Sequence, residues 1–463
     1  MLLCRTQRTT RVRVLMRGGA YLEADWRRET LRTNLWFVPA AVVLAAAGLF
    51  AATYSFDRAV YSGRAALPSW VISGHADEAR QILSTMAAAI ITVVGLVFSI
   101  TIVALTLAST QFGPRMLRNF IRDRGTQLTL GTFVATFFYT VVVLVVISPG
   151  PHGDFVPHLS VTVALGLTLV DLAVLIYFIN HIATSIQLPQ VIAGIARDLS
   201  GAIEAQGGED PAAPVNRECG PSWEELLVKI DESGTVIRTP HSGYLQFIRH
   251  ERLVRIAADA DAVIHLPYRP GHFLVKGHPL AAVWPAEAAA QVEHELARGQ
   301  VTGPYRTLTQ DVSFGVDQLV EIAIRALSPA VNDTFTAMTC IDWLGDCHCR
   351  ITTGWHPRRV RRDPNGWVRL IAYQADYERL IARSFEKVRQ AGVGMPAVMI
   401  RQLDALSKIM EQTLEAERRQ VLMDQADMIQ RACDDTVRED NDRRDVLVRY
   451  QALQAQMKAG PRR

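Results

Sequence analysis

The chain has 463 residues, a formal net charge of +3 and six cysteines. A nearly neutral chain has no electrostatic signature of nucleic-acid binding, and its length accommodates a membrane domain together with one or two further domains. The basic N-terminal arm contains no apolar run of the kind found in secretory signal peptides, and Met16 is an alternative to Met1 as the start of translation.

Four apolar stretches follow one another in the first part of the chain. They occupy residues 35–54, 86–108, 128–148 and 159–180. Each is about 20 residues long, which is the length that a helix needs to cross the hydrocarbon core of a bilayer. A helix also satisfies its own backbone hydrogen bonds there. The sequence therefore predicts a transmembrane domain of four helices over residues 35–190, after a basic arm at residues 1–34.

Arginine residues flank these stretches on alternating sides. The arginines of the arm and of the second loop are Arg5, Arg8, Arg11, Arg13, Arg17, Arg27, Arg28, Arg32, Arg115, Arg118, Arg122 and Arg124. The third loop has no lysine or arginine, and the first loop has few. Because basic loops stay on the cytoplasmic side, we expect a multi-pass protein of the bacterial inner membrane with both termini in the cytoplasm. We also expect the basic segments to contact anionic headgroups and the cysteines to be reduced thiols.

Hydroxyl side chains recur every seven positions in the second stretch. They belong to Thr85, Thr92, Ser99 and Thr106. A seven-residue repeat keeps these side chains near one face of a helix. One interpretation is close helix packing, because small and hydroxyl residues let membrane helices approach and exchange hydrogen bonds. The other is a polar stripe lining a pore built by several subunits, which implies a homo-oligomer.

Asp171, in the fourth stretch, is the only formal charge in the four stretches. A carboxylate near the middle of a bilayer costs a few kcal/mol unless it is paired, protonated or hydrated, so such residues are candidates for functional sites. The alternative is a neutral carboxylic acid that is hydrogen-bonded to a hydroxyl of the second or third stretch. Thr136, Tyr139 and Thr140 are the candidates in the third stretch.

Residues 191–233 are predicted as a helix and a flexible linker, and short β-prone runs separated by glycine turns fill residues 234–285. This second segment resembles the barrel-sandwich hybrid of biotinyl and lipoyl carrier domains, which implies a small β domain. The hairpin that carries the modified lysine in those domains reads AVWPAEA here, and Lys276 lies in a different hairpin. We therefore expect the fold element without carrier activity and without a cofactor.

Residues 286–350 are predicted to be helical and contain the densest group of polar side chains. Apolar residues keep helical spacing over residues 314–327. Asp317, Glu321 and Arg325 follow one another at four-residue intervals on the other face of that helix. Two carboxylates at this spacing can hold a ligand or a metal ion. An ion pair between Glu321 and Arg325, which stabilises a helix by a few tenths of a kcal/mol, is the simpler explanation.

The cysteine pattern and the motif content argue against metal and catalytic sites. Cys347, His348 and Cys349 are adjacent, and paired C-x-x-C spacing is absent, so we predict no metal site. The chain also has no glycine-rich phosphate loop, zinc-protease motif or nucleophile elbow. The sequence therefore indicates no catalytic residue.

A larger group of residues forms a family signature. Those considered as a possible ligand site are Arg306, Gln310, Asp311, Asp317, Glu321, Arg325, Ser328, Asn332 and Asp333. Together with the second apolar stretch and the basic loop after it, they resemble an uncharacterised bacterial family of predicted membrane proteins, domain of unknown function twenty-two fifty-four. The resemblance covers nearly the whole chain. It implies the architecture given above and no agreed activity.

The remaining residues, 351–463, are predicted as a C-terminal helical region. The expected fold class is therefore four transmembrane helices followed by a cytosolic α+β region. The leading functional hypothesis is an oligomeric ion channel or solute conduit gated by the cytosolic domain. The alternatives are a membrane sensor or scaffold that signals to a cytosolic partner, and a membrane-bound enzyme that would use Asp317, Glu321, Asn332 and Asp333.

Overall fold

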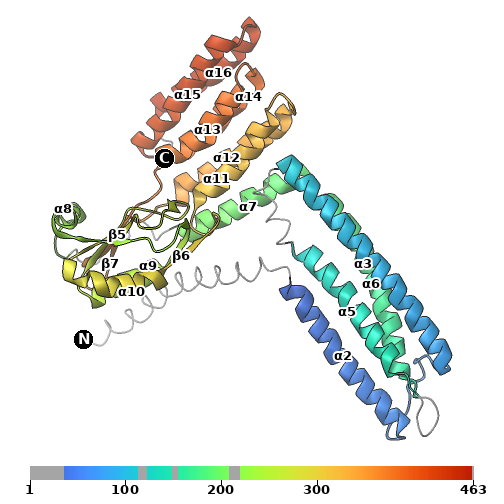
Figure 1. The fold of residues 1–463 in the computed structure, drawn as a ribbon. Helices are drawn as coiled ribbons and strands as arrows, with labels where there is room; N and C mark the ends of the chain where they lie inside the picture. The colour runs from blue at the N-terminus through green and yellow to red at the C-terminus, as the bar shows by residue number, and fades with distance from the viewer. Residues whose placement is uncertain (1–35, 113–122, 149–154, 208–218, 461–463) are drawn as a thin grey trace, which may run out of the picture. The chain divides into compact units, whose positions relative to one another are not determined.

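The computed structural model describes residues 36–112, 123–148, 155–207 and 219–460. The chain divides into two units, a helical unit within Arg28–Gln190 and a C-terminal unit that starts at Val191 (Figure 1). The predicted basic arm lies outside the described residues, as do the arginines of the second loop apart from Arg124.

The helical unit contains four helices that are long and apolar enough to cross a membrane. They are α2 (Phe37–Tyr61), α3 (Ala76–Phe112), α5 (Arg124–Val146) and α6 (His158–Ser185). The four predicted spans are thus confirmed as helices. Each of the four helices extends beyond its predicted stretch at one end or both. The longest extensions are those of α2, which continues to Tyr61, and of α3, which begins ten residues before residue 86.

Helix α5 is the most enclosed of the four. Half of its apolar window is buried inside the protein, against 22 % or less in the other three helices. The chain pairs α5 with each of the others, since α2, α3 and α6 all contact it. Tyr139 and Val143 of α5 pack with Leu83 of α3 and Ala164 of α6 in one apolar cluster. Helix α5 is therefore the centre of this unit.

The C-terminal unit begins within α7 (Leu188–Gln206), includes α8 (Trp223–Ser233) and continues into two separate sheets. The larger sheet has the strand order β1-β5-β3-β8-β7. Its strands are β1 (Thr235–Arg238), β5 (Pro279–Trp284), β3 (Val263–Leu266), β8 (Val368–Ala372) and β7 (Val360–Arg362). All neighbours are antiparallel except β3 and β8, which are parallel with Ile264 opposite Leu370.

The smaller sheet has the order β4-β2-β6. It consists of β4 (Phe273–Leu274), β2 (Gly243–Ile248) and β6 (Gln300–Gly303). Strands β1 to β5 therefore lie in residues 234–285, where short β-prone runs were predicted, and the mixed α+β class is confirmed. Neither sheet closes on itself, so the barrel-sandwich resemblance is not confirmed. Strands β7 and β8 come from residues 351–463, which were predicted as helical.

Helices cover both faces of the larger sheet. On one face, α9 (His250–Asp259) and α10 (Ala289–Gly299) pack in the same cluster as Ile264 and Leu370. On the other face, α8 contributes to a cluster that contains residues of β3 and β8. Alternate residues of the strands therefore face two different apolar layers, as expected for a sheet that is buried on both sides.

Six helices complete the C-terminal unit in the described part of the chain. They are α11 (Val312–Ala326), α12 (Thr334–Gly354), α13 (Tyr377–Ala391), α14 (Pro396–Gln412), α15 (Ala416–Thr436) and α16 (Asp440–Ala459). Helices α15 and α16 are separate, because Val437 turns into the core with extended backbone. Gly345 lets α12 approach α14 closely, since a Cβ there would lie 3.2 Å from the Cβ of Ala405.

Candidate functional site

The buried face of α5 is polar, although the helix has the length and composition of a membrane span. Its buried polar residues are Thr126, Gln127, Thr129, Thr136, Tyr139 and Thr140. Such side chains lower the hydropathy of a span and are retained where they find hydrogen-bond partners on neighbouring helices. Thr136 has its partner on α6, and Tyr139 has its partner on α2.

Asp171 of α6 faces this polar side of α5. Its side chain is buried, and the hydroxyl of Thr136 lies 3.1 Å from Oδ1 as a donor. Oδ2 of Asp171 is also buried and has no hydrogen-bond partner among the described residues. A buried carboxyl oxygen without a partner is costly. Among the described residues of the helical unit, Oδ2 of Asp171 is the one buried side-chain polar atom that has no hydrogen-bond partner.

Tyr139 lies toward the other end of the same polar face. Its hydroxyl is 2.8 Å from Oγ1 of Thr53 on α2. Near it, Asp57 of α2 accepts hydrogen bonds from the backbone N–H groups of Leu159 and Ser160, both at 2.9 Å. The Ser160 hydroxyl donates to the same carboxylate at 2.6 Å. Asp57 therefore caps the N-terminus of α6 from a neighbouring helix.

At the opposite end of α5, the N-terminal cap is also an acid. Asp123 caps α5 by accepting from the backbone N–H of Thr126 at 2.8 Å. Its Oδ2 also lies 2.7 Å from Nε2 of His181 on α6. Gly125 makes room for this contact, because a Cβ there would lie 2.5 Å from the same nitrogen. Polar groups thus occur at both ends and in the middle of the α5–α6 interface.

The hydroxyl stripe of α3 is separate from this interface. Thr85, Thr92, Ser99 and Thr106 are all exposed on the surface of the helical unit. The hydroxyls of Thr85 and Thr92 each donate at 2.8 Å to the carbonyl four residues earlier. Gly95 lies on the same face, and nothing comes within 4 Å of a Cβ built there. No other described span of the same chain therefore covers the stripe, and Asp171 does not lie on it.

In the C-terminal unit, three of the signature residues form one charged network. Arg306 contacts the carboxylates of Asp311, at 2.7 Å, and Asp317. Two arginines from other segments complete it. Arg269, between β3 and β4, lies 3.3 Å from Asp311, and Arg383 of α13 lies 2.7 Å from Asp317. Three arginines thus surround two aspartates at the point where the β domain meets α11.

This network is enclosed and positively charged. The side chain of Asp311 is fully buried, whereas Arg383 is 40 % exposed. Burial, together with the charges of Arg269, Arg306 and Arg383, lowers the pKa of the nearby His272 to about 4. His272 is therefore neutral at pH 7, in agreement with an excess of positive charge around it.

Other signature residues attach the β domain to α11 through the backbone. The Gln310 amide accepts from the N–H of Ile248 at 2.8 Å and donates to its carbonyl at 3.1 Å, so it continues the ladder of β2. Gly271 has a φ of +96°, and a Cβ there would lie 2.0 Å from Oδ2 of Asp311. The geometry therefore gives these residues a structural role in joining two parts of the unit.

The remaining signature residues lie at the far end of α11 and do not reach the network. Asn332 adopts a left-handed backbone with a φ of +49°, and the Ser328 carbonyl accepts from its N–H at 2.9 Å. Asp333 caps α12 by accepting from the N–H of Thr336 at 3.0 Å. Glu321 and Arg325 lie between the two groups on α11. A ligand site that uses all nine predicted residues at once is not assembled in one place.

Comparison with known proteins agrees with this architecture. The family model described as "Predicted membrane protein (DUF2254)" matches residues 32–408. This chain belongs to that family. Among curated proteins, it is 30 % identical over 385 residues to uncharacterized proteins of Mycobacterium bovis and Mycobacterium tuberculosis, covering 81 % of this chain and 72 % of each relative. No solved structure matches the chain.

The cysteines of this family member do not form a metal centre in the described part of the chain, where no group of three or more potential metal-binding residues occurs. His348 points to Ser384, with Nε2 at 2.6 Å from its hydroxyl. Burial raises the pKa of the Cys347 thiol to about 12, so this group is protonated at neutral pH. Thiolates, not thiols, bind metal ions, so the neutral Cys347 thiol is unsuited to coordination.

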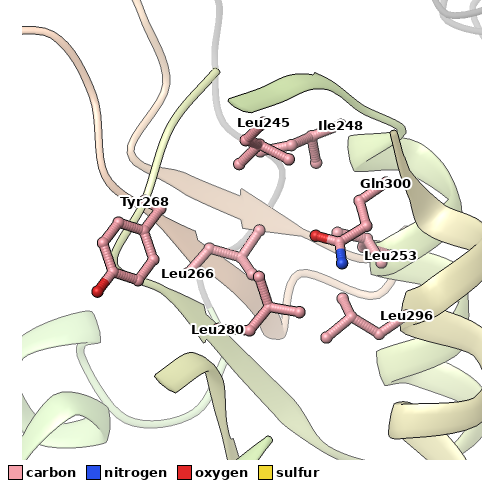
Figure 2. A pocket seen from close by; sticks show the side chains of 8 residues that line it. All are labelled: Leu245, Ile248, Leu253, Leu266, Tyr268, Leu280, Leu296 and Gln300. Atoms are coloured by element: carbon pink, nitrogen blue, oxygen red, sulfur yellow. The ribbon is translucent and has the colours of Figure 1, made fainter. Parts of the chain in front are cut away.

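A small apolar cavity lies inside the β domain (Figure 2). The residues that line it are Leu245, Ile248, Leu253, Leu266, Tyr268, Leu280, Leu296 and Gln300. It has no room for a water molecule, and leucine side chains point into it from several strands and helices. The cavity is a packing gap between the two sheets and does not qualify as a ligand site.

Proposed function

We propose that the protein is an oligomeric ion conduit of the bacterial inner membrane that carries protons past Asp171. The supporting observation is the polar interface of α5 and α6, where Asp171 is buried with Oδ2 unpartnered. Ionisable residues inside membrane spans are expensive, and in transporters and pumps they form proton relays. An oxygen with no partner is free to accept a proton from water or from a neighbouring hydroxyl.

Further hydroxyl groups extend the polar interface on one side of Asp171. Thr136 contacts its Oδ1, and Tyr139, one helical turn further along α5, bonds to Thr53. Beyond them, Asp57 and Ser160 form a fully hydrogen-bonded pair at the end of α6. On the opposite side, the interface ends at Asp123 and His181. Acids at both ends and in the middle suit a path that passes protons between the two surfaces.

The orientation proposed from the arginines assigns the two ends of this path to the two sides of the membrane. Arg124 starts α5, so the end with Asp123 and His181 would face the cytoplasm by the positive-inside rule. Both termini and the C-terminal unit would then be cytoplasmic, and the basic segments would contact anionic headgroups. Asp57 would lie at the outer end.

The stripe on α3 supports an oligomer. A lipid-facing helix surface made of Thr85, Thr92, Gly95, Ser99 and Thr106 offers little dispersion contact to acyl chains, but it lets a second helix approach closely. Its seven-residue spacing suits a left-handed helix pair. We therefore propose that α3 packs against α3 of another copy, and that the proton path lies within each copy.

Gating by the C-terminal unit is supported by chain connectivity. Helix α6, which carries Asp171, ends at Ser185, and α7 begins at Leu188. Only two residues separate the helices, so a movement of α7 would be transmitted to α6. The C-terminal unit could in this way control the α5–α6 interface.

Flux measurements test the proposal. The purified protein would be reconstituted into liposomes that contain a pH-sensitive dye, and a potassium diffusion potential would drive ion movement. We expect acidification or alkalinisation that depends on the sign of the potential. If a folded oligomer passes no ion at any pH or voltage, the conduit proposal is wrong, and the alternative of a membrane sensor with a cytosolic partner gains support.

A further inference from the structure

Arg361 of β7 is a half-buried cation without a direct partner among the described residues. Its Nε is buried and makes no hydrogen bond, and no carboxylate of the described residues lies within ion-pair distance of its guanidinium. The neighbouring Arg362 differs, since its Nη1 donates to the carbonyl of Gly366 at 3.0 Å. Even partial burial of a charge is costly without a counter-charge. An anion bound beside Arg361 would therefore be stabilised.

The sheet register places Arg361 beside the start of α9. Arg361 lies opposite Leu370 in the β7–β8 pair, and cross-strand partners share one face of a sheet. Leu370 is in the same apolar cluster as Leu253 of α9. The side chain of Arg361 therefore lies on the face that α9 covers, at the edge of the sheet.

The N-terminus of α9 is not capped by a side chain. Arg249 occupies the N-cap position and makes no capping hydrogen bond. No described residue accepts a hydrogen bond from the backbone N–H of His250, Glu251 or Arg252, the first three residues of the helix. Free N–H groups and the positive end of the helix dipole together attract anions.

The surrounding charges are mainly positive. Burial and the charge of Arg361 lower the pKa of His250 well below its usual range. Burial and the charge of Arg358 lower the pKa of Arg361 to about 10, and Glu251 has the opposite effect. Arg361 is still a cation at neutral pH. Glu251, in the first turn of α9, is exposed and makes no direct ion pair with Arg361, so it offsets only part of the positive charge.

From these observations, we propose that the N-terminus of α9 together with Arg361 and His250 binds a phosphate group. The free N–H groups match phosphate oxygens, and a guanidinium is well suited to bind them in pairs. The phosphate can belong to a soluble molecule or to the headgroup of an anionic phospholipid. This inference is independent of the proton path, because it uses no residue of the helical unit.

Calorimetry on the full chain in nanodiscs of phosphatidylcholine tests the proposal. Inorganic phosphate is the probe, and Arg361→Gln is compared with Arg362→Gln, whose arginine is already hydrogen-bonded. We expect saturable binding to the wild type and to Arg362→Gln. In Arg361→Gln, binding should weaken by roughly tenfold or more, because charge-assisted hydrogen bonds are lost. No binding to the wild type, or equal binding to both variants, would overturn the proposal.

Two additional measurements are included, one on a second variant and one in a different lipid. Arg361→Lys retains the charge and should bind phosphate with intermediate affinity, which covers the case in which Arg361→Gln does not fold. Equal affinity of the wild type and Arg361→Lys, together with a misfolded Arg361→Gln, would contradict a role for the guanidinium. Repeating the wild-type titration in nanodiscs that contain phosphatidic acid distinguishes the sources. Loss of phosphate binding there would identify the lipid headgroup as occupant, and unchanged binding a soluble phosphate.

Discussion

Thr136 of α5 lies 3.1 Å from Oδ1 of Asp171 on α6, and the second oxygen of that carboxyl group is buried without a partner. This pair joins the two helices in the interior of the helical unit. A single hydroxyl can satisfy only part of a carboxyl group, so the structure retains an acid that is expensive to bury. Replacement of either residue distinguishes the effect of the buried acid on stability from its effect on proton transfer.

Asp171→Leu should therefore leave the protein at least as stable as the wild type. An apolar side chain of similar size removes the buried polar group and adds packing, and such replacements are often neutral or stabilising. Thermal unfolding in detergent, followed by tryptophan fluorescence, measures the effect. Thr136→Val is the matched comparison. It leaves both carboxyl oxygens unpaired and should destabilise by about 1–3 kcal/mol. A large loss of stability in Asp171→Leu would argue that Asp171 is a structural residue.

Asp57→Ala should destabilise the helical unit by about 1–2 kcal/mol or more, because helix capping by a carboxylate is lost. The variant leaves the N–H groups of Leu159 and Ser160 without their acceptor. Hydrogen exchange of the first turn of α6 would report the change directly. We expect exchange there to become faster than in the wild type, whereas exchange at the start of α5 should stay the same. Unchanged protection of residues 159 and 160 would contradict the capping role of Asp57.

Asp311→Ala should cost about 3–5 kcal/mol, because it removes a fully buried carboxylate, leaves Arg269 without its counter-charge and leaves Arg306 with Asp317 alone. The control is Arg383→Ala. Arg383 is 40 % exposed, and its partner Asp317 keeps the contact with Arg306, so we expect a change of about 1 kcal/mol or less. Urea unfolding of the two variants in detergent gives the comparison. Similar losses in both would mean that burial does not set the energy of this network.

His348 should make the C-terminal unit less stable in acid. Ser384 donates its own hydrogen to the Leu380 carbonyl at 3.0 Å, so Nε2–H of His348 donates to Ser384, and the unprotonated Nδ1 is buried with no partner. Burial lowers the pKa of His348 to about 4.

The direction of the pH effect follows from this lowered pKa. An unfolded chain has a histidine pKa near 6.5, so between pH 6.5 and pH 4 the unfolded state binds the proton and the folded state does not. Stability is unaffected by His348 above this range and falls as the pH decreases through it, by about 2 kcal/mol between pH 6.5 and 5. Urea unfolding of His348→Gln at pH 7.5 and 5 should show a smaller pH effect than the wild type. An identical effect would exclude His348 as its source.

Ser99→Cys should form a disulfide between copies of the chain in the membrane under mild oxidation. The stripe residue would face its equivalent on a neighbouring α3. Phe98→Cys is the control, because Phe98 is also exposed on α3 but points about 100° away from Ser99 around the helix. Non-reducing electrophoresis, with the wild type as the baseline for native cysteines, measures the dimer. Equal dimer formation at both positions would contradict a specific α3 interface.

The membrane helices could be predicted because length and hydropathy are local properties of the sequence. Asp57 was not identified as a residue of the first span, because the apolar run ends at residue 54 while α2 continues to Tyr61. The candidates for the polar partner of Asp171 could be narrowed to a few hydroxyl groups, because the spans contain few polar side chains. Which of them faces the acid depends on helix rotation, and the sequence does not determine rotation.

The charged network and the edge of the sheet depend on contacts between distant segments. Arg306, Asp311 and Asp317 stand out in one segment, but Arg269 and Arg383 come from segments far away in the chain. Strands β7 and β8 were missed because β7 is short and basic, and because β8 pairs in parallel with β3 across about one hundred residues. Such pairings have no local signal, since their hydrogen bonds form only in the folded chain.

Proton flux through Asp171→Asn liposomes tests the central claim most directly. Asparagine keeps the size of the side chain and cannot release a proton, so we expect flux to fall to the level of protein-free liposomes. The double variant Thr92→Val and Ser99→Ala alters the stripe of α3 and should conduct like the wild type once it assembles. Normal flux in Asp171→Asn, with loss of flux in an assembled stripe variant, would contradict the account and assign the path to the stripe.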